Sequence, residues 1–177
     1  MHTAEGQQRQ KKRENKVLQW LQQYYTVERE VQVSFSCFAS DGKFARLDGV
    51  IHLPERDLTV VVEVDEDQHV SYMPGCDTRR MMDVTTALMC SGTATPYLLW
   101  MRFNPDSFGV DDVKQKVKLV DKLSALKDLI DTYEPVKPVA VQYLFYDIDF
   151  KGCLALHADL EYHKEVKGLC LEPVWCA

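Results

Sequence analysis

The sequence of 177 residues predicts a single α/β (α+β) domain in which helices flank a mixed β-sheet. Two observations predict this fold class. The first is a helix-like segment that is followed by a hairpin-led set of three strands. The second is a further apolar strand that stands between two helix-like segments, a pattern typical of a sheet with helices packed on its faces.

The first part of the chain is expected to form one helix and three strands. Apolar residues recur at three- and four-residue spacing in 8–25, which predicts a helix. Segment 31–38 alternates as a strand does, and the Asp-Gly pair at 41–42 predicts a hairpin turn into a partner strand at 44–53. A third strand is predicted at 58–65, where nearly continuous valines indicate burial on both faces.

The second part of the chain is expected to alternate between helices and strands. The predicted elements are a helix at 77–89, a strand at 96–103, a long helix from 111 or 112 to 133, and a strand at 139–149. Ser91-Gly92 ends the first of these helices. The segment 135–138, which begins and ends with proline, is expected to be a short stiff connector.

Composition restricts the classes of protein that remain. A net charge of −6 argues against a general nucleic-acid binder, although residues 9–16 hold a basic cluster. That cluster is either a solvated face or a weak nuclear-localisation signal. A membrane span needs ~20 apolar residues, and the chain has no such run and a polar N-terminus, so we expect an intracellular protein, nuclear or cytoplasmic, with no membrane partner.

The cysteines also favour an intracellular protein. All six are scattered without a CxxC pair, which favours free thiols in a reducing compartment. Cys170 and Cys176 with His157 and His163 are an alternative zinc set, but their spacing matches no common structural zinc pattern.

The stretch VVVEVDEDQH brings several acids to the end of the third strand. Alternation places Glu63 and Asp65 on one face and the valines on the other, and Asp48 reaches Glu63 if the two strands pair. Two such charges ~4 Å apart repel by about 4 kcal/mol at an effective dielectric of 20. Either a proton is shared or a cation is bound, and carboxylate oxygens favour Mg²⁺ or Mn²⁺. The alternative is a solvated strand end, with His69 an ordinary loop residue.

Four motifs occur together with this cluster: RLDGVI, VVVEVDEDQH, CDTRRM and LLWMRFNPD. In this order the chain resembles the very-short-patch-repair (Vsr-like) branch of the PD-(D/E)xK nuclease superfamily, which includes the EDxHD homing endonucleases. The resemblance covers about residues 14 to 106. It implies a restriction-endonuclease-like sheet with a nuclease core at 1–134, and we expect 135–177 to be a C-terminal extension packed on the same domain.

The resemblance also implies roles for individual residues. Asp48 and Glu63 would be metal ligands, with the Val64 carbonyl a possible third. Asp65 stands where the wider superfamily has a lysine, and the Vsr-like branch also lacks that lysine. His69 would be the general base, because a neutral imidazole with a pKa near 6.5 accepts a proton from water at neutral pH.

Further side chains have two interpretations each. Glu14 either matches the acid that this branch places on its first helix or balances the neighbouring basic residues. Asp77 belongs to the D-x-x-R helix start or caps that helix. Of Arg79 and Arg80, we expect one to bind phosphate and the other to pair with the acids. Arg102 is expected to orient a carboxylate.

Together these observations predict a metal-dependent endonuclease that hydrolyses nucleic acid, with DNA as the expected partner and Mg²⁺ or Mn²⁺ as cofactor. By analogy with the family, cleavage would leave a 5′-phosphate and a 3′-hydroxyl. The alternative is a catalytically inactive nuclease-fold module that binds a protein partner, for example within an effector or a larger assembly. A third class, a metallohydrolase of a small phosphorylated molecule, would need a deep pocket rather than an open groove.

Overall fold

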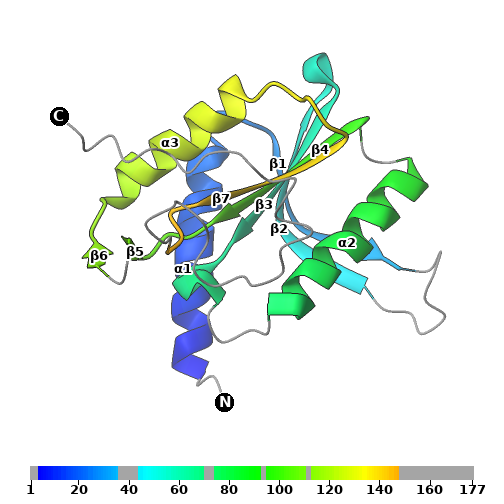
Figure 1. The fold of residues 1–177 in the computed structure, drawn as a ribbon. Coiled ribbons are helices and arrows are strands. Elements are labelled where there is room, and N and C mark those ends of the chain that lie inside the picture. Colours follow the sequence, from blue (N-terminus) through cyan, green and yellow to red (C-terminus); the bar gives the residue numbers. More distant parts are fainter. Residues whose placement is uncertain (1–3, 36–43, 70–73, 93–94, 111–112, 148–177) are drawn as a thin grey trace.

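A five-stranded mixed sheet forms the centre of the molecule, and three helices flank it, so the predicted fold class is confirmed. The structure is a computed structural model and describes residues 4–35, 44–69, 74–92, 95–110 and 113–147. Helices α1 and α3 lie on one face of the sheet and α2 lies on the other (Figure 1).

The bounds of the elements are as follows. The helices are α1 (Ala4–Leu21), α2 (Pro74–Ser91) and α3 (Leu119–Thr132), with short 3-10 turns η1 (Pro54–Arg56) and η2 (Glu66–His69). The strands are β1 (Val27–Ser34), β2 (Phe44–Leu53), β3 (Leu58–Val64), β4 (Tyr97–Phe103), β5 (Phe108–Val110), β6 (Val113–Gln115) and β7 (Val139–Leu144).

The order of strands in the central sheet is β1-β2-β3-β4-β7. The β1–β2 and β2–β3 pairs are antiparallel, whereas β3, β4 and β7 run parallel. Parallel neighbours need crossover connections, and α2 and α3 supply them. The carboxyl ends of β3, β4 and β7 therefore meet at one end of the sheet, where η2 also lies (Figure 1).

Alternation along β3 divides the core into two layers. Val60, Val62 and Val64 pack against α1 and α3, while Val61 packs against α2. All seven residues of this strand are buried, as the valine run predicts. Because Glu63 follows the same alternation as Val61, its carboxylate emerges on the α2 side of the sheet.

The β1–β2 pair changes face at Glu30, which has φ of 54°. Arg29 pairs with Gly49 and Val31 pairs with Leu47, but Glu30, which lies between them on β1, has no paired residue on β2. Ala45 and Leu47, rather than Arg46, therefore share the α2 core with Val50. Simple alternation would put Arg46 on the same face as Val50, but the exposed Arg46 side chain instead pairs with Glu30 at 3.3 Å.

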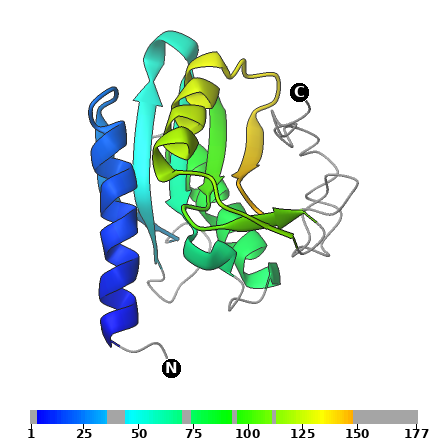
Figure 2. The same ribbon diagram turned by 90° about the vertical axis from the view of Figure 1, so that its left-hand side faces the viewer.

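The close approach of α1 to β2 explains why position 49 is a glycine. A Cβ at Gly49 would lie 2.8 Å from Leu18 Cδ2 and 3.2 Å from Val27 Cγ1. Glycine avoids this overlap without a shift of Leu18, and α1 lies directly on the sheet here. Glu14, one turn before Leu18, is thereby brought to the end of the sheet that holds Asp48. The N-terminal part of α1 extends past that end (Figure 2).

Several boundaries differ from the predicted ones. The first helix ends at Leu21 and β1 begins at Val27, four residues earlier than expected. The long helix begins only at Leu119, because the strands β5 and β6 take up the segment before it. The last strand ends at Leu144, where Phe145 turns with φ of 65°. The hairpin turn at 41–42 and the cysteine–histidine set of the C-terminal segment lie outside the described residues.

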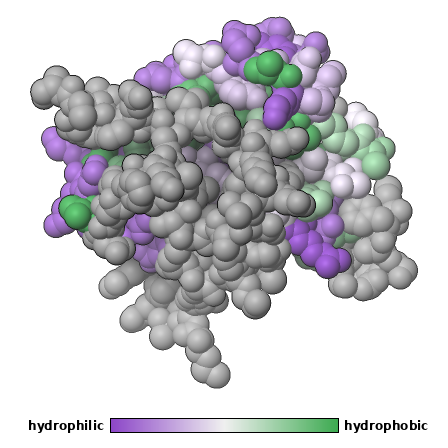
Figure 3. All heavy atoms as spheres, in the orientation of Figure 1, coloured by the Kyte–Doolittle hydropathy of each residue, from purple (hydrophilic) through white to green (hydrophobic). Residues whose placement is uncertain are grey.

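The described surface has a mixed character. Purple, hydrophilic atoms dominate the coloured part of Figure 3, and green atoms occupy small separate areas. The exposed large apolar side chains lie on different elements: Tyr24, Phe44, Met82, Val113, Val120 and Val136. Among the described helices, none combines the length and apolarity that crossing a bilayer requires.

Candidate functional site

Two carboxylates meet at the carboxyl end of β3. Asp48 Oδ2 of β2 accepts a hydrogen bond from the Val64 backbone N–H at 2.8 Å. Burial raises the pKa of Asp48 to about 6, although the Val64 bond opposes the rise. Burial and then the charge of Asp48 raise the pKa of Glu63 to about 7. The predicted proximity of Asp48 and Glu63 is therefore confirmed, and their charges oppose one another.

Arg80 of α2 is the direct partner of Glu63. Its Nη1 lies 2.9 Å from Glu63 Oε2 and its Nη2 lies 3.3 Å from Oε1, so the guanidinium contacts both carboxylate oxygens. Arg80 Nη2 also donates to the Arg46 carbonyl at 2.6 Å. The neighbouring Arg79 is 85% exposed and lies 4.0 Å from Asp83. Of the two arginines, Arg80 pairs with the acids and Arg79 projects into solvent.

Asp65 is held by a different pair of side chains. Its carboxylate is completely buried and accepts hydrogen bonds from Arg102 Nε and from the Tyr146 hydroxyl. Arg102 lies on β4 opposite Glu63, and Tyr146 follows β7. Burial, together with the Asp65 charge, raises the pKa of Tyr146 well above its usual value. Arg102 thus orients a carboxylate, whereas the contribution of Tyr146 was missed because 81 residues separate it from Asp65.

Glu14 reaches the same end of the sheet from α1. Burial and then the charge of Glu30 raise the pKa of its carboxyl, and Glu63 also raises it. Arg29 Nη2 lies 4.0 Å from Glu14 Oε1 and acts in the opposite direction. Glu66, immediately after Asp65, has its pKa raised to about 7, again mainly by burial. The structure thus places both Glu14 and Glu66 beside the predicted site.

The arginines do not offset the acids at this end of the sheet. Arg29, Arg80 and Arg102 are the cations that contact Glu14, Glu63 and Asp65. Asp48 receives a backbone N–H, but within the described parts of the chain it forms no ion pair with a cation. The carboxyl pKa values of Glu14, Asp48 and Glu63 remain raised despite these partners. Such a site gains free energy when it binds a proton or a cation.

Two predicted site residues are described only in part. His69 ends η2 directly after Asp67 and Gln68, whose φ values are 50° and 56°. The backbone of Asp77 lies in the first turns of α2. The side chains of His69 and Asp77 lie outside the described residues, so their proposed roles stay predictions.

The donor chemistry of the site fits a hard divalent cation. Asp48 and Glu63 offer carboxylate oxygens, and Val64, whose backbone N–H donates to Asp48, directly follows Glu63 in the chain. Oxygen donors of this kind suit Mg²⁺ or Mn²⁺, which keep several water ligands. In the described parts of the chain, no group of three or more His, Cys, Asp or Glu side chains is arranged to hold a metal ion. A bound ion would therefore have to share Glu63 with Arg80.

Comparisons with known proteins give no family for the chain. A scan against protein-family models, a search of curated proteins and a search of solved structures each found no match. The resemblance to the Vsr-like nucleases therefore depends on the four sequence motifs alone.

Proposed function

We propose that the protein is a metal-dependent endonuclease that hydrolyses nucleic acid, with DNA as the expected substrate and Mg²⁺ or Mn²⁺ as the cofactor. The observation that supports this proposal is the pair Asp48 and Glu63 at the carboxyl end of β3. Glu63 is buried and Asp48 is half-buried, and the charge of Asp48 raises the pKa of Glu63. Acids held together in this way are typical of sites that bind a cation for catalysis.

Asp48, Glu63 and the Val64 carbonyl would hold the ion. When bound, a divalent cation supplies charge stabilisation at the scissile phosphate and lowers the pKa of a coordinated water. Asp65, fixed by Arg102 and Tyr146, keeps the end of β3 in place beneath these ligands. The chain thus provides a rigid set of oxygen donors, as preorganised electrostatic catalysis requires.

The remaining residues would handle the proton and the phosphate. His69 would accept the proton of the attacking water, and Glu14 would support that step from α1. Arg79 projects into solvent from α2 and is suited to contact a phosphate of the nucleic-acid backbone. Arg80 would stay with Glu63 or move to the developing charge once a cation shares that carboxylate.

A location in the cytoplasm or nucleus belongs to the same proposal. Lys11, Lys12, Arg13 and Lys16 are all exposed on α1. They supply either a basic surface for the nucleic-acid backbone or a weak nuclear-localisation signal.

A cleavage assay with titrated metal tests the proposal. Plasmid and single-stranded DNA are incubated with wild type, Asp48→Asn and His69→Ala over a range of Mg²⁺ and Mn²⁺ concentrations. Asp48→Asn keeps an acceptor for the Val64 N–H but loses the charge, so we expect kcat/KM to fall by about 10³-fold. Asp131→Ala, at the opposite end of the sheet, is the matched control and should cleave as wild type does. Undiminished cleavage by both site variants would refute the assignment of the site.

One observation favours the second candidate, an inactive nuclease-fold module that binds a protein partner. Arg80 contacts both oxygens of Glu63, as an internal counter-ion would in a protein that holds no metal. Calorimetry with Mn²⁺ distinguishes the two candidates. Binding that Asp48→Asn abolishes supports the nuclease, and absence of both binding and cleavage in the wild type supports the module.

A further inference from the structure

The chain leaves β3 through a left-handed turn. Asp67 has φ of 50° and ψ of 30°, and Gln68 has φ of 56° and ψ of 21°. Neither residue is glycine, and consecutive non-glycine residues in this region are strained. Such strain persists only where surrounding contacts over-determine the backbone, and it is concentrated at functional sites.

Contacts from other elements hold this turn on both sides. The Asp67 N–H donates to Asp106 Oδ2 at 2.9 Å, and the Gln68 N–H donates to the Asp65 carbonyl at 3.0 Å. The Gln68 side chain is buried, and its Oε1 accepts the Asp147 N–H at 2.6 Å. The turn is therefore fixed by the loop after β4 and by the segment after β7.

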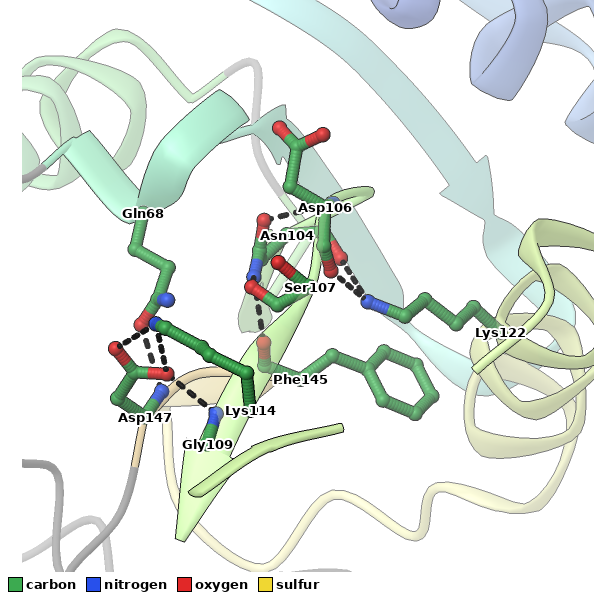
Figure 4. A network of polar contacts seen from close by, with 9 residues as sticks. All are labelled: Gln68, Asn104, Asp106, Ser107, Gly109, Lys114, Lys122, Phe145 and Asp147. Atoms are coloured by element: carbon green, nitrogen blue, oxygen red, sulfur yellow. Dashed lines mark hydrogen bonds and ion pairs between the residues drawn. The ribbon is translucent and has the colours of Figure 1, made fainter. Parts of the chain in front are cut away.

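Asp106 is itself held in place. Its N–H donates to Asn104 Oδ1 at 2.9 Å, and its carboxylate pairs with Arg13 of α1. The buried Lys122 of α3 donates to the carbonyl of Asn104 at 3.1 Å and to that of Asp106 (Figure 4). Helices α1 and α3 and the loop after β4 therefore hold Asp106, whose carboxylate receives the Asp67 N–H.

The segment after β7 is also held in place, by hydrogen bonds and an ion pair. Asn104 Nδ2 donates to the carbonyl of Phe145, another left-handed residue, at 2.7 Å. The Asp147 carboxylate accepts the Gly109 N–H and lies 2.9 Å from Lys114 Nζ (Figure 4). The partner of Gln68 is thus fixed to the β5–β6 hairpin.

We infer that Asp106 and Gln68 are positioning residues of the proposed nuclease site. They hold the Asp67–Gln68 turn in its left-handed conformation and so determine where the backbone places His69 relative to Asp65. This inference rests on the proposed function. A connection without such a role has no need of two strained residues, because glycine adopts this conformation without strain.

The test compares two substitutions at one position. Asp106→Ala removes the acceptor for the Asp67 N–H, whereas Asp106→Asn keeps an acceptor oxygen and loses only the charge. Steady-state cleavage separates kcat from KM, and hydrogen exchange follows the Asp67 and Gln68 amides. Asp131→Ala, which removes the acceptor of Tyr25 and Lys127 at the other end of the sheet, controls for a general loss of stability.

We expect Asp106→Ala to lower kcat by about 100-fold without changing KM, because a misplacement of roughly 1 Å can cost that much. Its Asp67 amide should exchange faster than in wild type. Asp106→Asn should recover most of kcat, and Asp131→Ala should behave as wild type does. A role in folding alone predicts instead that Asp106→Ala and Asp131→Ala change kcat equally.

The possible failures are distinguishable. If the wild type cleaves DNA and folded Asp106→Ala retains its kcat, the positioning role is wrong and the nuclease assignment stands. A wild type without metal-dependent cleavage overturns both. Failure of Asp106→Asn to recover kcat would also contradict the inference, since an acceptor oxygen at this position would then not be enough to hold the turn.

Discussion

The pKa values of acidic groups shift in opposite directions at the two ends of the central sheet. At the amino end of β3, burial alone would raise the pKa of Asp131, but hydrogen bonds from Lys127 and Tyr25 lower it. At the carboxyl end, burial and neighbouring acids raise the pKa values of Asp48 and Glu63 despite Arg80. One end is electrostatically compensated and the other is not.

The kinds of polar group that are buried also differ between the two ends of the sheet. Near the amino end, the Thr59 and Thr95 hydroxyls lie 2.9 Å apart, and His52 Nδ1 lies 3.2 Å from Thr59 Oγ1. The carboxyl end instead buries Asp65 and Arg102 together. Hydroxyl pairs are inexpensive to bury, whereas an ion pair is costly to desolvate. The carboxyl end therefore carries the larger desolvation cost.

The largest expected effect on stability is the loss of the buried Arg102. Arg102→Met leaves the Asp65 carboxylate buried without its cation, so we expect the free energy of unfolding to fall by about 4 kcal/mol. Urea denaturation at pH 7.5 measures the change. Lys127→Met at the amino end removes an exposed pair and should change stability little. Equal losses in the two variants would remove the proposed difference between the ends.

Sequence patterns predicted the part of this site that depends on neighbouring strands. The bounds of β2 were predicted as observed, and alternation along β3 correctly separated Glu63 from Val62. The spacing of Arg79 and Arg80 left their roles open, because helical periodicity alone does not show which residue faces the sheet. The packing of α2 decides between them: Arg80 contacts Glu63.

Other features depend on contacts that a local pattern cannot show. Tyr146 reaches Asp65 only because β7 joins the sheet beside β4. Glu30 is not a usual left-handed residue, so the change of face between β1 and β2 has no signal in the sequence. The helix predicted from 111 or 112 begins at Leu119, because the β5–β6 pairing overrides the helical spacing of the valines.

The second prediction concerns the pH dependence of stability. The pKa values of Asp48 and Glu63 rise from 3.8 and 4.5 to about 6 and about 7 on folding. The folded protein therefore binds more protons than the unfolded chain between these limits, and stability falls as pH rises through them. We expect these two groups to cause a loss of about 4 kcal/mol between pH 5 and pH 8.

Urea denaturation of wild type and of the Asp48→Asn, Glu63→Gln double variant measures this loss. All other titratable groups are common to both proteins, so the difference between the two curves isolates the two carboxyls. Mn²⁺ should restore the stability of the wild type at pH 8 and leave the double variant unchanged. Asp131→Asn should keep the wild-type slope, because the pKa of Asp131 is lowered and its titration lies below this range. Parallel curves for wild type and the double variant would contradict the prediction.

The smallest expected effect concerns the backbone strain of the left-handed turn after β3. Asp67 is exposed and has φ of 50°, so Asp67→Gly removes left-handed strain and keeps the backbone N–H that donates to Asp106. Relief of roughly 1–2 kcal/mol of strain exceeds the roughly 0.4–1 kcal/mol by which glycine favours the unfolded chain. We therefore expect the free energy of unfolding to rise by about 0.5 kcal/mol.

Thermal and urea denaturation of Asp67→Gly and Asp67→Ala measure this gain. The alanine variant is the control, because it removes the carboxylate and keeps the strained Cβ; it should not be stabilised. If the two variants have equal stability, the carboxylate rather than the backbone accounts for any change. If glycine alone stabilises the fold while kcat falls, the strained turn is retained for its geometry, and the carboxyl end gives up stability that the amino end keeps.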